Sequence, residues 1–155
     1  MEIVRVSVSD LPEVAGLIMR EFPYMNATPE KLRERIGRKN YFIYKAVANK
    51  ELAGFVDFEI DSSGELGKLN GLEVKEKFRA HGIGKELLKF AVEFLESAGC
   101  RRIQLLVKEK NEKAKALYNE FGFGFVGMYN KQLDNSLVEI MELDLGNGNE
   151  LRYVG

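Results

Sequence analysis

Cysteine and histidine are scarce in this sequence, with one of each among 155 residues. The single Cys100 excludes an internal disulfide, and without a Cys/His cluster or an HExxH pattern we expect no metal site. No apolar run is long enough to cross a membrane or to serve as a secretion signal. These absences favour a cytoplasmic protein that uses neither a metal nor a membrane.

An excess of charge of one sign is also missing. The chain has 23 Lys and Arg residues against 24 Asp and Glu residues, a formal net charge of -1, and the signs are evenly mixed. Proteins that bind nucleic acid normally carry basic blocks that attract phosphates, so nucleic acid is not expected as a partner. The length and the 45% hydrophobic content suit one domain, expected at residues 1–145 with a tail at 146–155.

Apolar periodicity and turn signals divide the chain into strands and helices, without an internal repeat. The predicted order is strand, two helices, three strands, helix, strand, helix and two strands, which is a mixed α/β or α+β domain. Strands are expected at residues 3–8, 41–47, 52–60, 68–74, 103–107, 125–132 and 136–145. The strand at 103–107 is mostly apolar, which is typical of a strand covered on both faces.

Capping residues mark the expected helix ends. Asp10, with Glu13 closing a capping box, and Thr28 are predicted to begin the first two helices. Asn111 is predicted to cap the last helix, and Gly99 to end the helix before it in a left-handed conformation.

The loop from Arg79 to Gly84 joins a strand to a helix. A turn that contains glycines and precedes a helix presents free N–H groups and the positive end of the helix dipole, which suits an anion. A Walker loop would need glycine at Arg79 and Ser or Thr at Glu86, and a Rossmann loop would need glycine at Leu87. The loop therefore does not indicate a nucleoside triphosphate or a dinucleotide. Taken alone, it fits equally well a turn that only serves tight strand–helix packing.

Two longer segments are more specific. The segment from Leu72 to Leu88 contains the pattern Arg/Gln-x-x-Gly-x-Gly/Ala at Arg79, Gly82 and Gly84. The segment from Asn111 to Phe123 fits Asn-x-x-Ala-x-x-Leu-Tyr-x-x-x-Gly-Phe at every specified position. Both patterns, in this order, resemble the two signatures of the GNAT family of N-acetyltransferases, and the order of elements agrees with that family from Ile3 to Leu145.

The resemblance implies a fold and a donor site. The fold would be a central, mostly antiparallel sheet of about seven strands flanked by about four helices. Its strands at 68–74 and 103–107 would splay apart to admit the pantetheine arm of acetyl-CoA. The backbone at 72–74 would bond the thioester and pantetheine, and amides at 80–85 the pyrophosphate. The cofactor-binding residues implied in this way are Leu72, Glu73, Val74, Arg79, Ala80, His81, Gly82, Ile83, Gly84, Lys85, Asn111 and Tyr118.

The resemblance also suggests catalytic groups. Tyr118 would protonate the departing thiolate as the general acid, although its helical spacing also fits a core aromatic or a tyrosine that only hydrogen-bonds the sulfur. The Leu72 N–H would stabilise the oxyanion. His81 is expected to be a phosphate neighbour or an exposed loop residue rather than a base.

The general base departs from the family pattern. Where some members carry a glutamate on the fourth or fifth strand, this chain has Lys68 and Leu106. Glu73 is the preferred candidate, with Asp57 and Glu59 as alternatives, although a charged residue on a strand more often lies on a solvated face.

The expected activity is transfer of the acetyl group of acetyl-CoA to a primary amine, which could be a protein N-terminus, a lysine or a small molecule. The acceptor side would be built by the first helices and the last hairpin, which offer Phe22, Tyr24, Met25 and Tyr129. Two alternatives stay open: a sensor that binds acetyl-CoA without transferring it, and a protein that presents helices to a partner. The sequence is compatible with a homodimer.

Overall fold

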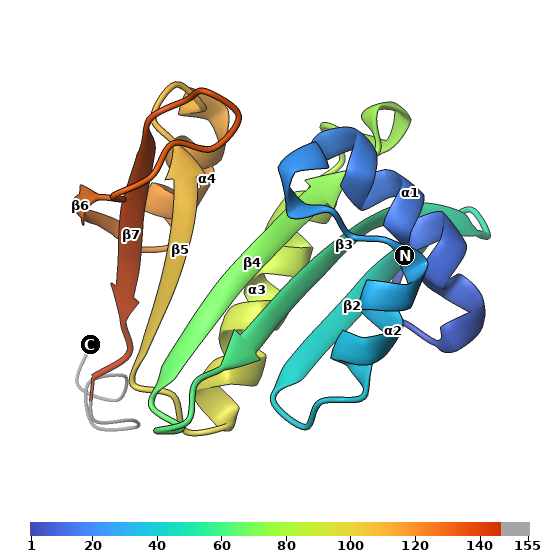
Figure 1. Ribbon diagram of the computed structural model, residues 1–155, viewed down its shortest axis with the longest axis horizontal. Helices are drawn as coiled ribbons and strands as arrows, with labels where there is room; N and C mark the ends of the chain where they lie inside the picture. Colours follow the sequence, from blue (N-terminus) through green and yellow to red (C-terminus); the bar gives the residue numbers. More distant parts are fainter. Residues whose placement is uncertain (147–155) are drawn as a thin grey trace. The chain divides into compact units, whose positions relative to one another are not determined.

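The computed structural model describes residues 1–146, and within this range it contains seven strands and four α-helices (Figure 1). The elements are β1 (Glu2–Arg5), η1 (Val8–Asp10), α1 (Leu11–Glu21), η2 (Pro23–Met25), α2 (Pro29–Ile36), β2 (Tyr41–Ala48), β3 (Glu51–Ile60), β4 (Leu66–Val74), η3 (Glu76–Phe78), α3 (Ile83–Ser97), β5 (Arg102–Lys108), α4 (Glu112–Glu120), β6 (Gly124–Met128) and β7 (Val138–Asp144). The strands are hydrogen-bonded in the order β1-β2-β3-β4-β5-β7-β6. The predicted mixed α/β fold with a seven-stranded sheet and four helices is confirmed.

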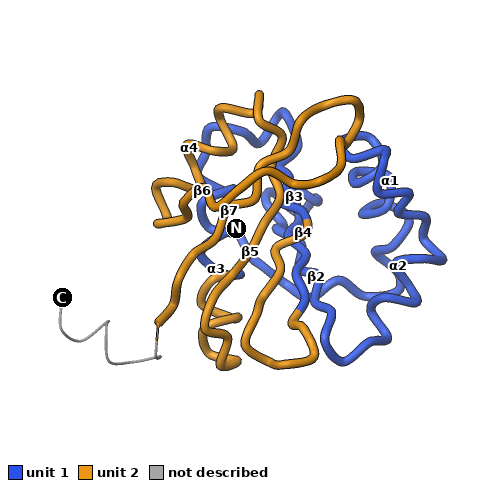
Figure 2. Tube along the Cα trace, turned by 60° about the vertical axis from the view of Figure 1, so that its left-hand side comes forward, with its two compact units in different colours: residues 1–59, 71–91 blue, residues 60–70, 92–155 orange. Residues whose placement is uncertain are grey.

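The chain divides into two compact units, coloured separately in Figure 2. The first comprises residues 1–59 and 71–91, and the second comprises residues 60–70 and the chain from Val92 onward. Both β4 and α3 therefore contribute residues to each unit. Of the predicted tail at 146–155, only Gly146 is among the described residues, and the rest lies outside them.

The first unit is built on β1, β2 and β3, which pair in antiparallel fashion. Its core joins α1 and α2 to one face of these strands, and the residues of α1 buried in this core are Leu11, Val14, Ala15, Leu17 and Ile18. On the other face, the Tyr44 ring lies 4.5 Å from that of Phe90, in the part of α3 that belongs to this unit. Both faces of β2 and β3 are therefore covered, as Figure 1 shows.

Capping and turn residues set most ends of the helices and strands in this unit. The Thr28 hydroxyl accepts from the Lys31 N–H at 3.3 Å and caps α2, as predicted. Asn49 and Lys50 both adopt positive φ angles, which is the backbone of a tight hairpin turn between β2 and β3.

The capping role predicted for Asp10 is wrong. A 3-10 turn at Val8–Asp10 precedes the helix, with Ser7 as its N-cap and Asp10 as its third residue. Its carboxylate accepts from the Ser7 N–H at 2.8 Å and from Lys45 Nζ at 2.6 Å, and it makes no capping hydrogen bond to α1. The Asp10 carboxylate therefore bonds to the preceding turn and to Lys45 of β2 instead of to the free N–H groups of α1.

In the second unit, β5 lies between β4 and β7. Leu66–Leu69 pair in parallel with Arg102–Leu105. Burial alternates along β5, with Leu105 3% and Leu106 38% exposed. The prediction that this strand is covered on both faces is therefore wrong, because helices cover only the face that carries its odd-numbered residues.

The helix ends of this unit follow the sequence signals. Gly99 has a φ of 97°, and the Cys100 N–H donates to the Leu95 carbonyl at 3.0 Å, which ends α3 as predicted. The last two strands are shorter than expected. Between them, Asp134 and Asn135 form a turn of positive φ, and Leu133 and Ser136 pair as an isolated bridge outside both strands.

Candidate functional site

The predicted phosphate loop lies between η3 and α3, within the first unit. Ala80 and Gly82 have φ angles of 66° and 80°, so the chain turns through two left-handed residues just before the helix. The first α-helical bond runs from the Glu86 N–H to the Gly82 carbonyl at 3.1 Å. Ile83 and Gly84 thus occupy the first turn, where amides have no acceptor within the helix. Gly82 is exposed, and no atom lies within 4 Å of the position of an added Cβ. The loop therefore has the geometry of an anion cradle.

Arg79 fastens this loop to the end of β4. Its Nε donates to the Val74 carbonyl at 2.9 Å, and its Nη2 lies 2.9 Å from Glu73 Oε1. The same Nη2 is 3.8 Å from a carboxylate oxygen of Glu21, in the last turn of α1. The Arg79 guanidinium therefore makes all of these contacts with groups of the protein itself, at the end of β4 and in α1.

Glu73 is a half-buried carboxylate, with 20% of its side chain exposed. Burial raises the pKa of Glu73 above its ordinary value, the charge of Glu21 raises this pKa further, and Arg79 lowers it. A carboxylate with a raised pKa is a better proton acceptor than an exposed one. The ion pair with Arg79 opposes that tendency and holds the side chain in place.

The backbone of β4 is placed by β3. The Lys75 N–H donates to the Ala53 carbonyl at 2.8 Å. The Glu73 carbonyl oxygen lies against Gly54 of β3. Because neighbouring residues of a strand direct their N–H groups to opposite edges, those of Val74 and Leu72, on either side of Glu73, point away from β3. These are two of the three residues whose backbone was predicted to bond the donor.

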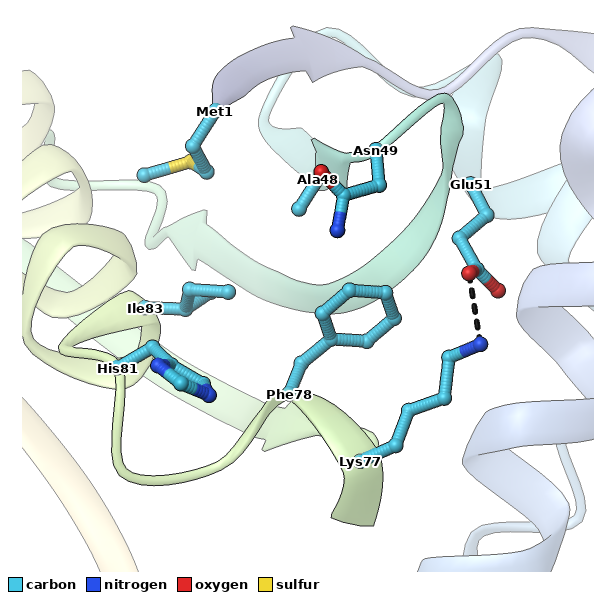
Figure 3. Close-up of a pocket in the computed structure, with 8 residues that line it drawn as sticks. All are labelled: Met1, Ala48, Asn49, Glu51, Lys77, Phe78, His81 and Ile83. Carbon is cyan, nitrogen blue, oxygen red and sulfur yellow. Dashed lines mark ion pairs between the residues drawn. The ribbon is translucent and has the colours of Figure 1, made fainter.

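A pocket of about 380 Å³ opens beside the loop (Figure 3). Met1, the turn between β2 and β3, Lys77, Phe78, His81 and Ile83 line it. Lys77 forms an ion pair with Glu51 at 2.7 Å and lies over the Phe78 ring, as the close-up shows. His81 is exposed and projects from the cradle at the edge of this pocket.

Replacement of His81 by alanine tests whether its side chain helps to hold the donor. If the imidazole contacts a phosphate, His81→Ala should raise the Michaelis constant for acetyl-CoA about tenfold or more and leave kcat unchanged, because a hydrogen bond to a charged group contributes about 1.5 kcal/mol or more. Steady-state kinetics at saturating acceptor measure both constants. An unchanged Michaelis constant would assign His81 to the solvent-exposed alternative.

Asn111 and Tyr118 belong to the second unit. The Asn111 side chain accepts from the Ala114 N–H at 3.2 Å and caps α4, as predicted. Tyr118 is half-buried on α4, and its ring meets the Phe123 ring edge-on at 5.9 Å. Tyr118 is therefore only partly enclosed by its neighbours.

Asp57, which the sequence offered as an alternative base, is only 1% exposed, so it does not lie on the solvated face that is commoner for a strand carboxylate. It lies in the apolar run of β3, whose residues from Leu52 to Phe58 are all buried. A charged residue inside an otherwise apolar strand was the signal that could have identified it.

Two expected absences concern metals and membranes. Within residues 1–146, His, Cys, Asp and Glu side chains form no group of three or more that could hold a metal ion. No helix of that range combines the length and the apolar composition needed to cross a membrane.

Comparison with known proteins identifies the family. The chain matches the model of the acetyltransferase (GNAT) family over residues 11–123, and it therefore belongs to that family.

Two sequence relatives carry acetyltransferase names. An uncharacterized N-acetyltransferase in the pepI 3′ region of Lactobacillus delbrueckii subsp. lactis is 28% identical over 144 residues, which cover 79% of this chain and 83% of the relative. The spermine/spermidine N(1)-acetyltransferase of Bacillus subtilis is 34% identical over 84 residues, or 50% of this chain. That match spans only 55% of the Bacillus protein.

Two solved structures resemble this one. The ribosomal-protein-S18-alanine N-acetyltransferase of Escherichia coli has a TM-score of 0.80 at 22% identity, with 96% of each chain covered, which shows a shared fold. A PaiA N-acetyltransferase from Thermoplasma acidophilum, solved with coenzyme A, has a TM-score of 0.72 at 25% identity, with 92% of this chain and 98% of that chain covered.

Proposed function

We propose that this protein moves the acetyl group of acetyl-CoA to a primary amine, by direct attack of the amine on the thioester in a ternary complex. The observation that carries this proposal is the anion cradle, in which Ala80 and Gly82 turn the chain into the first turn of α3. Membership of the GNAT family and the coenzyme A bound by the Thermoplasma relative support the donor. We propose that residues 1–145 act as one catalytic domain.

The donor would be held mainly by backbone groups. In this proposal the amides from Ala80 to Lys85 bind the pyrophosphate, with the His81 side chain beside it. The backbone of Leu72, Glu73 and Val74 bonds the thioester and pantetheine, and Asn111 is proposed as a further contact of the pantetheine. Arg79 would serve the donor by holding the loop against the end of β4, as its bond to the Val74 carbonyl suggests.

Catalysis requires a neutral amine, a polarised carbonyl and a protonated leaving group. The Leu72 N–H would stabilise the oxyanion that forms when the amine nitrogen attacks the thioester carbon. As the carbon–sulfur bond breaks, Tyr118 would donate its proton to the thiolate. The proton released by the amine would pass to Glu73, whose partly buried carboxylate has a raised pKa.

The kind of amine that accepts the acetyl group is a more specific part of this proposal. The Bacillus relative is named for polyamines and the Escherichia coli structure for a protein N-terminus, so both kinds of amine are candidates for this chain. An alternative function is a sensor that binds acetyl-CoA without transferring it. Lys68 and Leu106, where some family members have a glutamate, leave this alternative open, while Tyr118 argues against it. A homodimer and a cytoplasmic location stay predictions.

A panel of amines tests the activity directly. The protein is incubated with acetyl-CoA and, in separate reactions, spermidine, lysine, an aminoglycoside and short peptides with free N-termini, and the release of free thiol is followed. We expect release above the acceptor-free background with at least one amine. The same peptides with blocked N-termini, and acetylated spermidine, serve as matched controls.

Two other results would decide for the alternatives. A thermal shift of several degrees with coenzyme A but no thiol release with any amine would favour the sensor. No thermal shift with coenzyme A would favour the protein that presents helices to a partner and would contradict the proposed donor.

A further inference from the structure

Two buried polar side chains of the first unit have no part in the proposed chemistry. Tyr41 of β2 and Asp57 of β3 are each 1% exposed. The Tyr41 hydroxyl donates to Asp57 Oδ2 at 2.6 Å, within the core formed by the strands with α1 and α2. This short hydrogen bond fixes one edge of the carboxyl group.

Burial of the Asp57 carboxyl group costs free energy, because the group loses its contact with water. Burial raises the pKa of Asp57 to about 6, while the Tyr41 hydroxyl, the Arg35 guanidinium and the Gly71 N–H lower it and Glu59 raises it. The site therefore disfavours the charged form of this carboxyl group. Buried ionised groups with incomplete hydrogen bonding destabilise a fold, so their presence needs another reason.

The second oxygen of this carboxyl lies against β4. Among the described residues no group makes a hydrogen bond of standard geometry with Asp57 Oδ1, although the Gly71 N–H is near enough to lower the pKa. A Cβ on Gly71 would lie 2.8 Å from Oδ1 and 3.2 Å from the Phe55 ring. Only glycine leaves room for β4 to approach the carboxylate this closely.

Gly71 directly precedes Leu72, whose N–H points away from β3 and is the proposed oxyanion donor. The carboxylate and the phenyl ring of Phe55 therefore form a rigid support behind the peptide that connects Gly71 to Leu72. Movement of this support would rotate the peptide and turn the N–H away from its target. Preorganised donors lose their effect with small changes in direction.

We propose that Asp57, held by Tyr41, is a positioning residue for acetyl transfer, because its contact with Gly71 sets the direction of the Leu72 N–H. The inference rests on the proposed function of that N–H. The residue does not touch the substrate, and the role is distinct from that of the general base.

Alanine at position 57 removes the support. We expect Asp57→Ala to lower kcat at least tenfold at 25 °C, with the Michaelis constant for acetyl-CoA changed less than about threefold, because an oxyanion donor acts in the transition state. Val56→Ala is the matched control, since Val56 is equally buried on the same strand but points to the opposite face. It should lower the melting temperature and leave kcat within twofold.

Two further variants separate positioning from loss of stability. Asp57→Asn keeps the shape and an acceptor toward Gly71, so it should restore kcat to within about fivefold of the wild type. Tyr41→Phe removes only the hydroxyl and should lower kcat less than Asp57→Ala does. It also keeps the question testable if Asp57→Ala does not fold.

A double mutant tests the contact itself. Gly71→Ala should lower kcat because its methyl group displaces the carboxylate, and in combination with Asp57→Ala it should cause little additional loss. The inference would be overturned if the losses of kcat in the two single mutants add fully in the double mutant, or if folded Asp57→Ala or Tyr41→Phe has a normal kcat. In either case, a wild type that is active in the amine panel would leave the proposed function standing. A wild type that binds acetyl-CoA but transfers nothing would overturn both.

Discussion

Replacement of Tyr118 by phenylalanine is expected to lower kcat by a factor of about 100 or more, while the Michaelis constant for acetyl-CoA stays within twofold. A general acid typically contributes 10²- to 10⁴-fold to a rate, and the loss of one hydroxyl removes the proton without removing the ring. The ring contact of Tyr118 with Phe123 does not need the hydroxyl, so α4 should keep its place. Steady-state kinetics with the best amine of the panel, together with thermal unfolding, measure the effect.

Phe123→Leu is the matched control for this result. It removes the ring that packs against Tyr118 but leaves the hydroxyl, so it should lower the melting temperature with a loss of kcat smaller than about fivefold. An unchanged kcat in Tyr118→Phe would remove Tyr118 as the acid. The thiolate would then have to leave unprotonated or take its proton from water.

Gly54→Ala is expected to be the most destabilising of the small changes in β3. An added Cβ would overlap the Glu73 carbonyl oxygen and would lie 3.2 Å from the Val74 Cα, and backbone atoms of a paired strand have little freedom to move. We expect a loss of about 3 kcal/mol in the free energy of unfolding, at the upper end for overpacked sites. Urea denaturation measures this loss, and a shifted β4 should also weaken the binding of acetyl-CoA.

Gly16→Ala provides the comparison. Gly16 lies within α1, and no atom is found within 4 Å of the position that its Cβ would occupy. Alanine favours a helix over glycine by about 1 kcal/mol, so this variant should be as stable as the wild type or more stable. If Gly54→Ala unfolds at the same urea concentration as the wild type, the close approach of β3 and β4 does not constrain the site as the structure indicates.

The candidate site divides into parts that the sequence could predict and parts that it could not. The cradle at Gly82 and the cap at Asn111 were predicted, because both depend on backbone conformations that a few adjacent residues determine. The bonds of Arg79 to Val74 and Glu73 were not predicted, although all three residues lie close together in the chain. Which partner a long side chain selects depends on the bend of the chain between them, and that bend is set by η3.

Asp10 and Asp57 show why side-chain roles are harder to predict than elements. Asp10 was predicted to cap a helix, and Asp57 was an alternative base for which a solvated face was the commoner environment. Asp10 instead binds Lys45, which is 35 residues away, and Asp57 binds Tyr41, which is 16 residues away. Neither partner is visible in the local pattern, since the strand pairing brings it near.

The amino-acid sequence was sufficient for the order of strands and helices, most of their caps and the family signatures, because each arises from periodicity, turn chemistry or spacing within about a dozen residues. The tertiary structure decided which faces of β5 are covered, where the loop is fastened and which carboxylates are buried. Those features depend on the pairing of strands and on packing between residues far apart in the chain. The backbone conformation of a residue therefore followed from its neighbours in the sequence. The pKa, the exposure and the bonding partner of its side chain depended on segments that are distant in the sequence and packed together in the fold.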